Sequence, residues 1–183
     1  MKDFLLKGSF DKPIPSVRRI FKLLHEIEKY NFSLQEIYIY SYSRKATFVA
    51  LNCAYKRRIV TIPINLGLSG VVDKENSFSG DNKTPLTGKK DFFMTGKSRV
   101  RGIRYKIAGS EEEAVYSRDG QINLGSAFVG IDAVNSKGVN RGIGFHGHKD
   151  NLLEPTNGCI RMYNDDLLLL APIMVPGVKV FII

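Results

Sequence analysis

The sequence predicts a mainly β domain with a minor α component. From Ile37 onward, apolar residues recur at every second position in several short runs, which is the spacing of strands that bury one face. Glycines separate most of these runs, and only two stretches carry the period of a helix. At 183 residues the chain has the length of one ordinary domain, and its 43% hydrophobic and 25% charged residues are typical of a globular protein.

An amphipathic helix is predicted near the N-terminus, from Pro15 to Asn31. Its apolar residues recur at spacings of three and four, and a proline suits the first turn. These residues are Val17, Ile20, Phe21, Leu23, Leu24, Ile27 and Tyr30. A lone helix of this length is marginal in water, so we expect the apolar stripe to pack on the main domain. Binding of the stripe to a membrane surface is the alternative.

Three runs with a period of two follow this helix and predict a three-strand meander. The runs lie at residues 37–39, 48–53 and 59–64. Residues 68–90, which contain several glycines and serines, are expected to form a long loop. Further short strands are predicted at residues 91–95, 101–107, 127–131 and 142–146.

The C-terminal part of the chain predicts a short helix and a closing strand. Asn164 is the expected N-cap, and Asp165 and Asp166 suit the positive end of the helix dipole. Pro172 perturbs or ends this helix. Residues 178–183 then form the expected last strand.

The chain is basic, with 27 Lys and Arg against 18 Asp and Glu and a net charge of +9. This excess favours anionic partners such as nucleic acid, acidic lipid or a cell-wall polymer. The basic residues are scattered, however, and the clusters at 56–58 and 89–90 adjoin predicted turns, so solvated loops are favoured over a nucleic-acid patch. The sequence shows no signal peptide and no apolar window near the ~20 residues of a membrane span.

The two cysteines stand in different settings, and no disulfide framework is indicated. Cys53 ends an alternating apolar run, so we expect a buried and inert core thiol. Cys159 lies in a turn that contains Gly158, and it follows His146 by 13 positions. An imidazole and backbone N–H groups lower the pKa of a nearby thiol and create a nucleophile. Cys159 is therefore the candidate nucleophile, with a small core hydrophobe as the competing interpretation.

His146 ends an apolar run at the mouth of a predicted strand and is the candidate general base, with a structural histidine as the alternative. Gly158 allows a tight turn and lets a substrate carbonyl approach the N–H groups around Cys159, where an oxyanion would be stabilised. Arg161 either anchors a substrate carboxylate or ties down the loop. Thr156 either hydrogen-bonds a histidine or braces the turn.

A zinc site competes with the catalytic interpretation. On a continuing strand, His146 and His148 would face the same side and could bind zinc together with Cys159. A catalytic zinc needs three protein ligands and a structural zinc needs four. The residues that could complete the set are Asp150, Glu154 and Asp165. The spacing leaves this alternative open, although we expect neither a metal nor a cofactor.

Together these segments resemble the catalytic domain of the bacterial L,D-transpeptidase family. The family pattern is a strand ending in His-Gly, a loop, then Ser or Thr, any residue, Gly-Cys, an apolar residue and Arg or Asn. Further family segments are a strand followed by glycine, a Thr-Pro segment and a closing strand. The matching positions in this chain are 143–147, 156–162, Asn164, Asp166, 64–67, 82–88 and 176–180.

The resemblance implies a β-sandwich-like catalytic domain over residues 35–183, with residues 1–34 as an N-terminal helical appendage. It implies a peptidoglycan enzyme of the periplasm or extracytoplasmic cell wall. Cys159 would attack the third residue of a tetrapeptide stem and release the terminal D-alanine. His146 would activate the thiol, and the carbonyl of Gly147 would orient the imidazole. The acyl group would pass to an amine in an L,D-transpeptidase, or to water in an L,D-carboxypeptidase.

The chain departs from the family pattern around the cleft. The spacing of 13 between His146 and Cys159 is shorter than in many members, and Asn157 stands where many have a second histidine. His148 is unusual and could substitute for that histidine. By the resemblance, the substrate or oxyanion side of the site comprises Gly158, Arg161, Thr156, Asn157 and His148. A non-catalytic wall-binding domain and a nucleic-acid-binding protein are the alternatives from other classes.

Overall fold

The computed structural model of the chain describes residues 15–73, 76–88, 91–100, 124–125, 127–135, 137–148 and 152–183. It confirms a mainly β fold with two α-helices, α1 (Pro15–Tyr30) and α2 (Asn164–Leu170). The strands are β1 (Ser33–Tyr40), β2 (Lys45–Leu51), β3 (Arg57–Pro63), β4 (Val71–Asp73), β5 (Thr84–Leu86), β6 (Phe92–Val100), β7 (Ala127–Ile131), β8 (Gly144–His146), β9 (Ile160–Arg161) and β10 (Lys179–Ile182).

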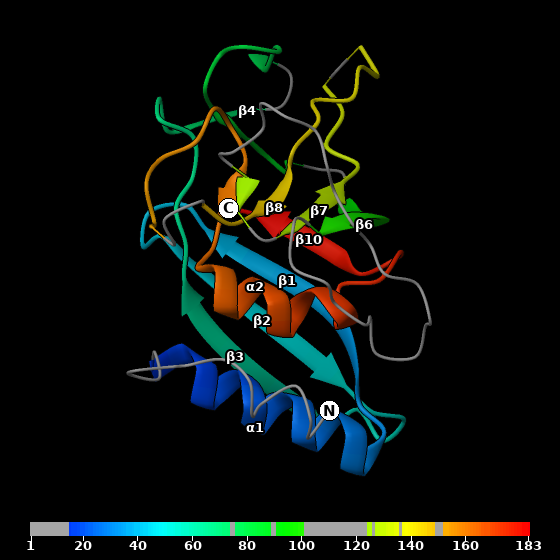
Figure 1. Cartoon of the computed structure of the whole chain (residues 1–183). Helices are drawn as coiled ribbons and strands as arrows, with labels where there is room; N and C mark the ends of the chain where they lie inside the picture. Colours follow the sequence, from blue (N-terminus) through cyan, green and yellow to red (C-terminus); the bar gives the residue numbers. More distant parts are fainter. Residues whose placement is uncertain are drawn as a thin grey trace.

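The strands form one large sheet and one small pair. The eight-stranded sheet has the order β3-β2-β1-β10-β6-β7-β8-β9, and β4 pairs with β5. The predicted meander is confirmed, because β1, β2 and β3 are consecutive antiparallel neighbours. The C-terminal strand β10 runs parallel to β1 and antiparallel to β6. It therefore joins the meander to the half of the sheet that carries β8 and β9 (Figure 1).

The large sheet curls around its core. β2 and β8 are five places apart in the sheet order, which would be roughly 24 Å in a flat sheet. The rings of Phe48 in β2 and Phe145 in β8 nevertheless have centroids 6.4 Å apart. Both side chains are fully buried in a cluster that contains residues of α1, α2 and both halves of the large sheet. The two halves of the sheet thus enclose one common core.

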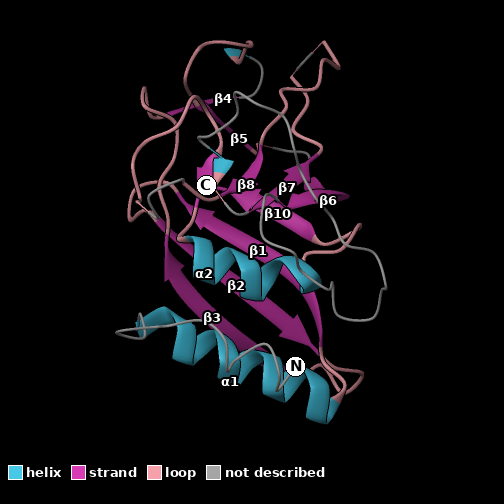
Figure 2. Cartoon of the chain, viewed as in Figure 1, coloured by secondary structure: helices cyan, strands magenta, loops and turns pink. Residues whose placement is uncertain are grey.

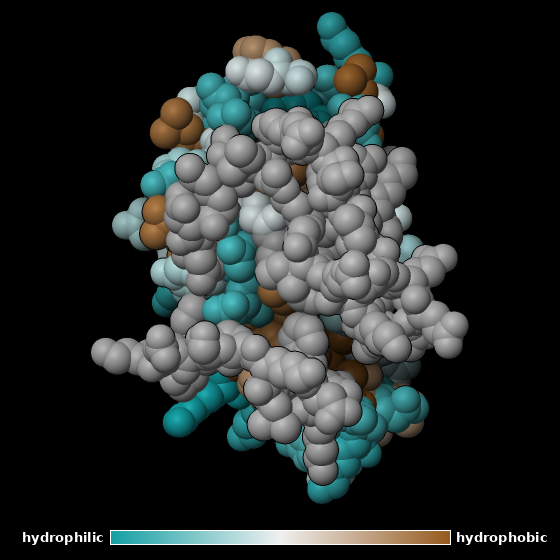
Figure 3. All heavy atoms as spheres, in the orientation of Figure 1, coloured by the Kyte–Doolittle hydropathy of each residue, from teal (hydrophilic) through white to brown (hydrophobic). Residues whose placement is uncertain are grey.

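Helix α1 covers part of this core with its apolar stripe, as expected from the sequence. Ile20, Leu23 and Leu24 are buried members of the core cluster, and α1 contacts both α2 and β3. Burying each of these side chains stabilises the fold by about 1.5–3 kcal/mol. Both helices lie on the same side of the meander, and hydrophobic side chains are visible in that part of the molecule (Figures 2 and 3). None of the described helices is long and apolar enough to cross a bilayer.

The prediction of an uninterrupted loop at residues 68–90 is wrong, because β4 and β5 lie within this range. These three-residue strands contain Pro85 and carry no alternation that would identify them. Their position depends on a close approach to the chain after β3. A Cβ on Gly67 would lie 2.4 Å from the carbonyl oxygen of Asn82, so only glycine permits this contact. Thr84 also accepts a hydrogen bond from the N–H of Gly67 at 2.8 Å.

The prediction that Cys53 is a buried core residue is also wrong, since its side chain is exposed. Strand β2 ends at Leu51, before the alternating pattern reaches the cysteine. The side chain of Asn52 then accepts hydrogen bonds from the N–H groups of Ala54 and Lys56, at 3.1 and 3.0 Å. These bonds form a tight turn, from which Cys53 projects into solvent. Both cysteines are free thiols.

The beginning of α2 differs from the prediction by one residue. Tyr163 occupies the N-cap position, and Asn164 is the first helical residue. The Asn164 side chain donates to the carbonyl of His148 at 2.7 Å and accepts from its N–H at 3.2 Å. It is therefore a clamp on the chain after β8 rather than a cap. Pro172 lies in a 3₁₀ turn that follows α2, as the sequence predicts.

The remaining predicted strands are confirmed at β6, β7, β8 and β10, with small changes at their ends. The predicted strand at residues 101–107 lies outside the described residues.

Candidate active site

The pairing of β8 with β9 brings the strand end that carries the candidate base next to the turn that carries the candidate nucleophile. The two strands are parallel, and His146 is the register partner of Arg161. Side chains at paired positions share a face, and alternate residues along a strand share it too. Cys159 stands two residues before Arg161, at the level of Gly144 in β8. Because β9 begins at Ile160, the register places His146 and Arg161 on one face, and the turn that carries Cys159 leads directly into this end of β9.

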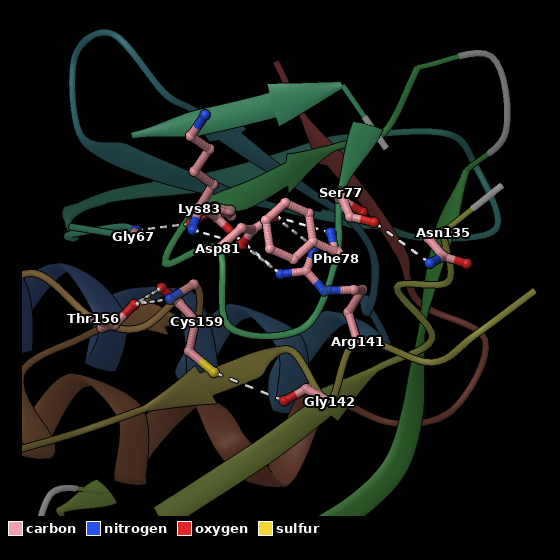
Figure 4. Close-up of polar contacts among 12 residues, drawn as sticks. Gly67, Ser77, Phe78, Asp81, Lys83, Asn135, Arg141, Gly142, Thr156 and Cys159 are labelled. Carbon is pink, nitrogen blue, oxygen red and sulfur yellow. Dashed lines mark hydrogen bonds and ion pairs between the residues drawn. The ribbon is translucent and has the colours of Figure 1, made fainter. Parts of the chain in front are cut away.

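The turn before Cys159 is held by Thr156 and Gly158 (Figure 4). The Thr156 hydroxyl donates to the carbonyl of Cys159 at 2.6 Å and accepts from the N–H of Gly158 at 3.1 Å. Gly158 has a φ of +123°, which side chains rarely adopt, and a Cβ there would lie 2.8 Å from the carbonyl oxygen of Lys83. These contacts fit the bracing alternative for Thr156, and both the backbone conformation and the space at position 158 favour glycine.

The chain after β3 supports this turn from the other side. The N–H of Thr156 donates to the carbonyl of Leu66 at 2.9 Å, and the N–H of Leu68 donates to that of Thr156 at 2.7 Å. Asn65 forms two backbone hydrogen bonds with Arg161, at 2.8 and 2.9 Å. Because these bonds lie on both sides of Cys159, they define the path of the backbone through the nucleophile position.

His146 is buried, with 3% of its surface exposed. Its Nδ1 lies 2.7 Å from the carbonyl oxygen of Gly147. A carbonyl only accepts hydrogen bonds, so Nδ1 carries the proton of the neutral ring and Nε2 is the free base. Burial lowers the pKa of His146 to about 4, the charges of Arg161 and His148 act in the same direction, and the bond to Gly147 opposes them. The imidazole is therefore neutral at neutral pH.

Burial raises the pKa of the Cys159 thiol. The backbone N–H of Gly144 and the charges of Arg161 and Arg141 act in the opposite direction. The thiol donates to the carbonyl of Gly142, with the sulfur 3.8 Å from the oxygen. Although surrounded by protein, the residue keeps part of its surface exposed. The thiol and the imidazole are thus both neutral at rest, so the thiol must lose its proton before or as the sulfur attacks.

The N–H groups around Cys159 differ in their availability to an oxyanion. The N–H of Gly158 is occupied by Thr156. Within the described residues, the N–H of Cys159 has no hydrogen-bond acceptor. The N–H of Cys159 is consequently the better candidate for an oxyanion donor. Asn157 is exposed at the rim of the turn.

His148 does not continue the strand that carries His146, because β8 ends at His146. Its Nε2 lies 3.7 Å from a carboxylate oxygen of Glu154, and its backbone is clamped by Asn164. No group of three His, Cys, Asp or Glu side chains that could hold a metal occurs in the part of the chain that the structure describes. Asp150, one of the proposed ligands, lies outside that part.

Arg161 is buried, and its Nη1 donates to the carbonyl of Pro155 at 3.4 Å. This contact fits the loop-binding role among the two predicted alternatives. Its charge lowers the pKa of both His146 and Cys159.

Sequence reasoning missed Asp81 and Arg141, which form an ion pair behind the cysteine turn (Figure 4). The two residues are 60 positions apart. Single charged residues are common in loops, so no local signal could have paired them.

The family model described as the L,D-transpeptidase catalytic domain (YkuD) matches residues 38–182. No curated protein matches the chain in sequence.

Several solved structures are similar in fold. Bd1075 of Bdellovibrio bacteriovorus is 17% identical, with a TM-score of 0.53, and the match covers 85% of this chain and 50% of that chain. The C442S mutant of an Enterococcus faecium L,D-transpeptidase is 12% identical (TM-score 0.44; 82% and 50% covered). An L,D-transpeptidase (Yku) from Stackebrandtia nassauensis is 15% identical (TM-score 0.42; 92% and 64% covered). The match thus spans about half the length of the first two.

Proposed function

This chain belongs to the L,D-transpeptidase catalytic domain family, and from that premise we propose that it is a cysteine acyltransferase of peptidoglycan. It cleaves the terminal D-alanine from a tetrapeptide stem and transfers the remaining acyl group to an amine of another stem. It acts outside the cytoplasm, where this polymer lies. The observation that supports the proposal is the buried imidazole of His146, whose Nδ1 is bonded to Gly147 and whose register partner Arg161 stands two residues after Cys159.

In the first half of the reaction, Nε2 of His146 accepts the thiol proton as the sulfur of Cys159 attacks the carbonyl carbon of the third stem residue. A C–S bond forms, and the carbonyl oxygen becomes an oxyanion that the N–H of Cys159 stabilises. The tetrahedral intermediate then loses D-alanine: its C–N bond breaks, and the imidazolium returns the proton to the leaving amine. The product is a thioester on Cys159.

In the second half, an acceptor amine attacks the thioester carbonyl, and His146 accepts a proton from the amine nitrogen. The C–S bond breaks, the new amide leaves, and the imidazolium reprotonates the thiolate. With water in place of the amine, the same steps give a shortened stem and free enzyme. Access of the acceptor to the thioester therefore distinguishes a transpeptidase from a carboxypeptidase.

The test is incubation of the protein with disaccharide-tetrapeptide muropeptides, with the products identified by mass spectrometry. We expect cross-linked dimers and free D-alanine, and no products from Cys159→Ala or His146→Ala. Cys53→Ser is the matched control, because this exposed thiol lies outside the site and its loss leaves turnover unchanged. Release of D-alanine without dimers would indicate the carboxypeptidase instead. Unaltered turnover by Cys159→Ala would refute both activities.

A further inference from the structure

Asp81 and Arg141 form a buried, bidentate ion pair beside the cysteine turn. Arg141 donates from Nη2 to one carboxylate oxygen at 2.8 Å and from Nη1 to the other at 3.2 Å. Only 2% of the Arg141 side chain and 3% of the Asp81 side chain are exposed. The ion pair of Arg58 with Glu26, by contrast, leaves 42% of Arg58 exposed. A buried ion pair adds little net stability, because both charges lose their hydration. We therefore look for the role of this pair in the backbone segments that it holds in place.

Asp81 holds the turn that packs against Gly158. The carboxylate accepts hydrogen bonds from the N–H groups of Phe78 and Lys83, at 3.0 and 2.9 Å. These bonds shape the turn at residues 78–83. The carbonyl of Lys83, at the end of this turn, is the group against which Gly158 packs.

Arg141 directly precedes the residues whose backbone groups contact the sulfur of Cys159. The N–H of Arg141 donates to the carbonyl of Ala133 at 2.8 Å, which holds its backbone. The next residue, Gly142, accepts the hydrogen bond of the Cys159 thiol. The N–H of Gly144, two residues further on, also faces the sulfur. The pair therefore joins the turn behind the nucleophile to the segment that makes polar contacts with its sulfur (Figure 4).

We propose that the Asp81–Arg141 ion pair is a positioning element for the nucleophile, which holds residues 78–83 against Gly158 and residues 141–144 against the sulfur of Cys159. The proposal rests on the proposed role of Cys159 as the nucleophile. Both side chains are almost completely buried, so they do not touch substrate and act only through the groups they hold.

The charges around the sulfur make this role measurable. Burial raises the pKa of Cys159, whereas the Gly144 N–H and the charges of Arg161 and Arg141 lower it. His146, whose imidazole is neutral, is the register partner of Arg161. Removal of the pair displaces the Gly142–Gly144 segment and removes one of the two cationic groups. Both changes reduce the fraction of thiolate at neutral pH.

The main variant is Asp81→Asn/Arg141→Gln, prepared in the Cys53→Ser background so that Cys159 is the sole thiol. It removes both charges together and leaves no unpaired charge in the interior, so it folds even where a single substitution does not. Arg141→Lys keeps the charge but loses the two-pronged contact. Glu26→Gln, which breaks the ion pair with Arg58 on α1, is the control for loss of an ion pair away from the site.

The first measurement is the rate of alkylation of Cys159 by iodoacetamide as a function of pH, which does not depend on turnover. We expect the double variant to react roughly threefold to tenfold more slowly at neutral pH, with the midpoint of the profile moved to higher pH. The second is turnover of muropeptides, where we expect kcat to fall by about tenfold or more with little change in KM. Arg141→Lys should not restore kcat, and Glu26→Gln should behave as the parent.

A folded double variant with the alkylation profile and kcat of the parent would overturn the proposal. Parental alkylation and kcat in Arg141→Lys would also overturn it, because the positive charge alone would then be sufficient. A loss of thermal stability alone would also overturn it. If the parent protein turns over no muropeptide, the proposed function fails, but the alkylation profile still decides whether the pair positions the thiol.

Discussion

Asp166 should destabilise the folded protein at neutral pH, and Asp166→Asn tests this directly. Its side chain lies in the first turn of α2 with 0% of its surface exposed, where α2 contacts α1. Neither carboxylate oxygen forms a well-aligned hydrogen bond with any described residue. Burial raises the pKa of Asp166 from 3.8 to about 6, and the Ser16 hydroxyl and the charge of Arg19 on α1 oppose this rise incompletely.

The magnitude follows from the linkage between protonation and folding. The pKa is raised in the folded state, so the folded protein keeps a proton that the unfolded chain has already lost. A rise of about two pKa units corresponds to about 3 kcal/mol. This cost is absent below the unfolded pKa, develops as the pH rises through the interval up to about 6, and is complete at neutral pH. An asparagine has the same shape and does not titrate, so the cost is absent from the variant at every pH.

The assay is urea unfolding followed by circular dichroism, because the chain has no tryptophan. Between about pH 3 and about pH 7, we expect the unfolding free energy of Asp166→Asn to rise relative to that of the parent by about 3 kcal/mol. Asp165→Asn is the matched control: the pKa of this neighbour is also raised by burial, but its side chain is only half-buried, so the pH-dependent change should be smaller. A difference that does not vary with pH would show that Asp166 is not the titrating group and refute the reasoning.

Three further predictions concern the site. The acid limb of kcat/KM should lie near pH 4, because protonation of His146 removes the base at about that pH; a limb near the ordinary histidine value of 6.5 in a pH–rate profile would contradict the burial argument. Gly158→Ala should destabilise the protein by about 1–3 kcal/mol in thermal unfolding and abolish turnover, because its φ of +123° and the nearby Lys83 carbonyl both oppose a side chain. Thr156→Val should lower kcat/KM by about tenfold while Thr156→Ser retains it, since the hydroxyl joins the N–H of Gly158 to the carbonyl of Cys159. Equal values of kcat/KM for the two variants would show that the hydroxyl does not stabilise the turn.

Much of the site was predictable because its signals are local. The glycine before Cys159 indicates a turn with an unusual φ, and an apolar run that ends in His146 indicates a strand whose last side chain is available for chemistry. The alternating runs likewise predicted the meander of β1, β2 and β3. In each case, neighbouring residues in the sequence carry the preference, so the rest of the fold is not needed to recognise it.

Other features depend on where distant segments meet. The exposure of Cys53 follows from the residue at which β2 stops pairing, and the role of Asn164 follows from its contact with the backbone of His148. The short strands β4 and β5 pair next to the place where Gly67 approaches the backbone of Asn82, a contact between segments that the sequence alone does not reveal.

The sequence by itself determined the two helices, the meander and the identity of the candidate nucleophile and base, because periodicity, turn chemistry and the Gly-Cys motif are properties of adjacent residues. Only the tertiary structure decided which groups surround them. The register of β8 against β9 pairs His146 with Arg161, two residues after Cys159. Thr156 accepts a hydrogen bond from the N–H of Gly158, and Asp81 pairs with Arg141 from 60 positions away. Burial then determines the protonation states of His146 and Cys159. The physical reason is that desolvation and hydrogen bonding act through space, between groups that the chain brings together only when it folds.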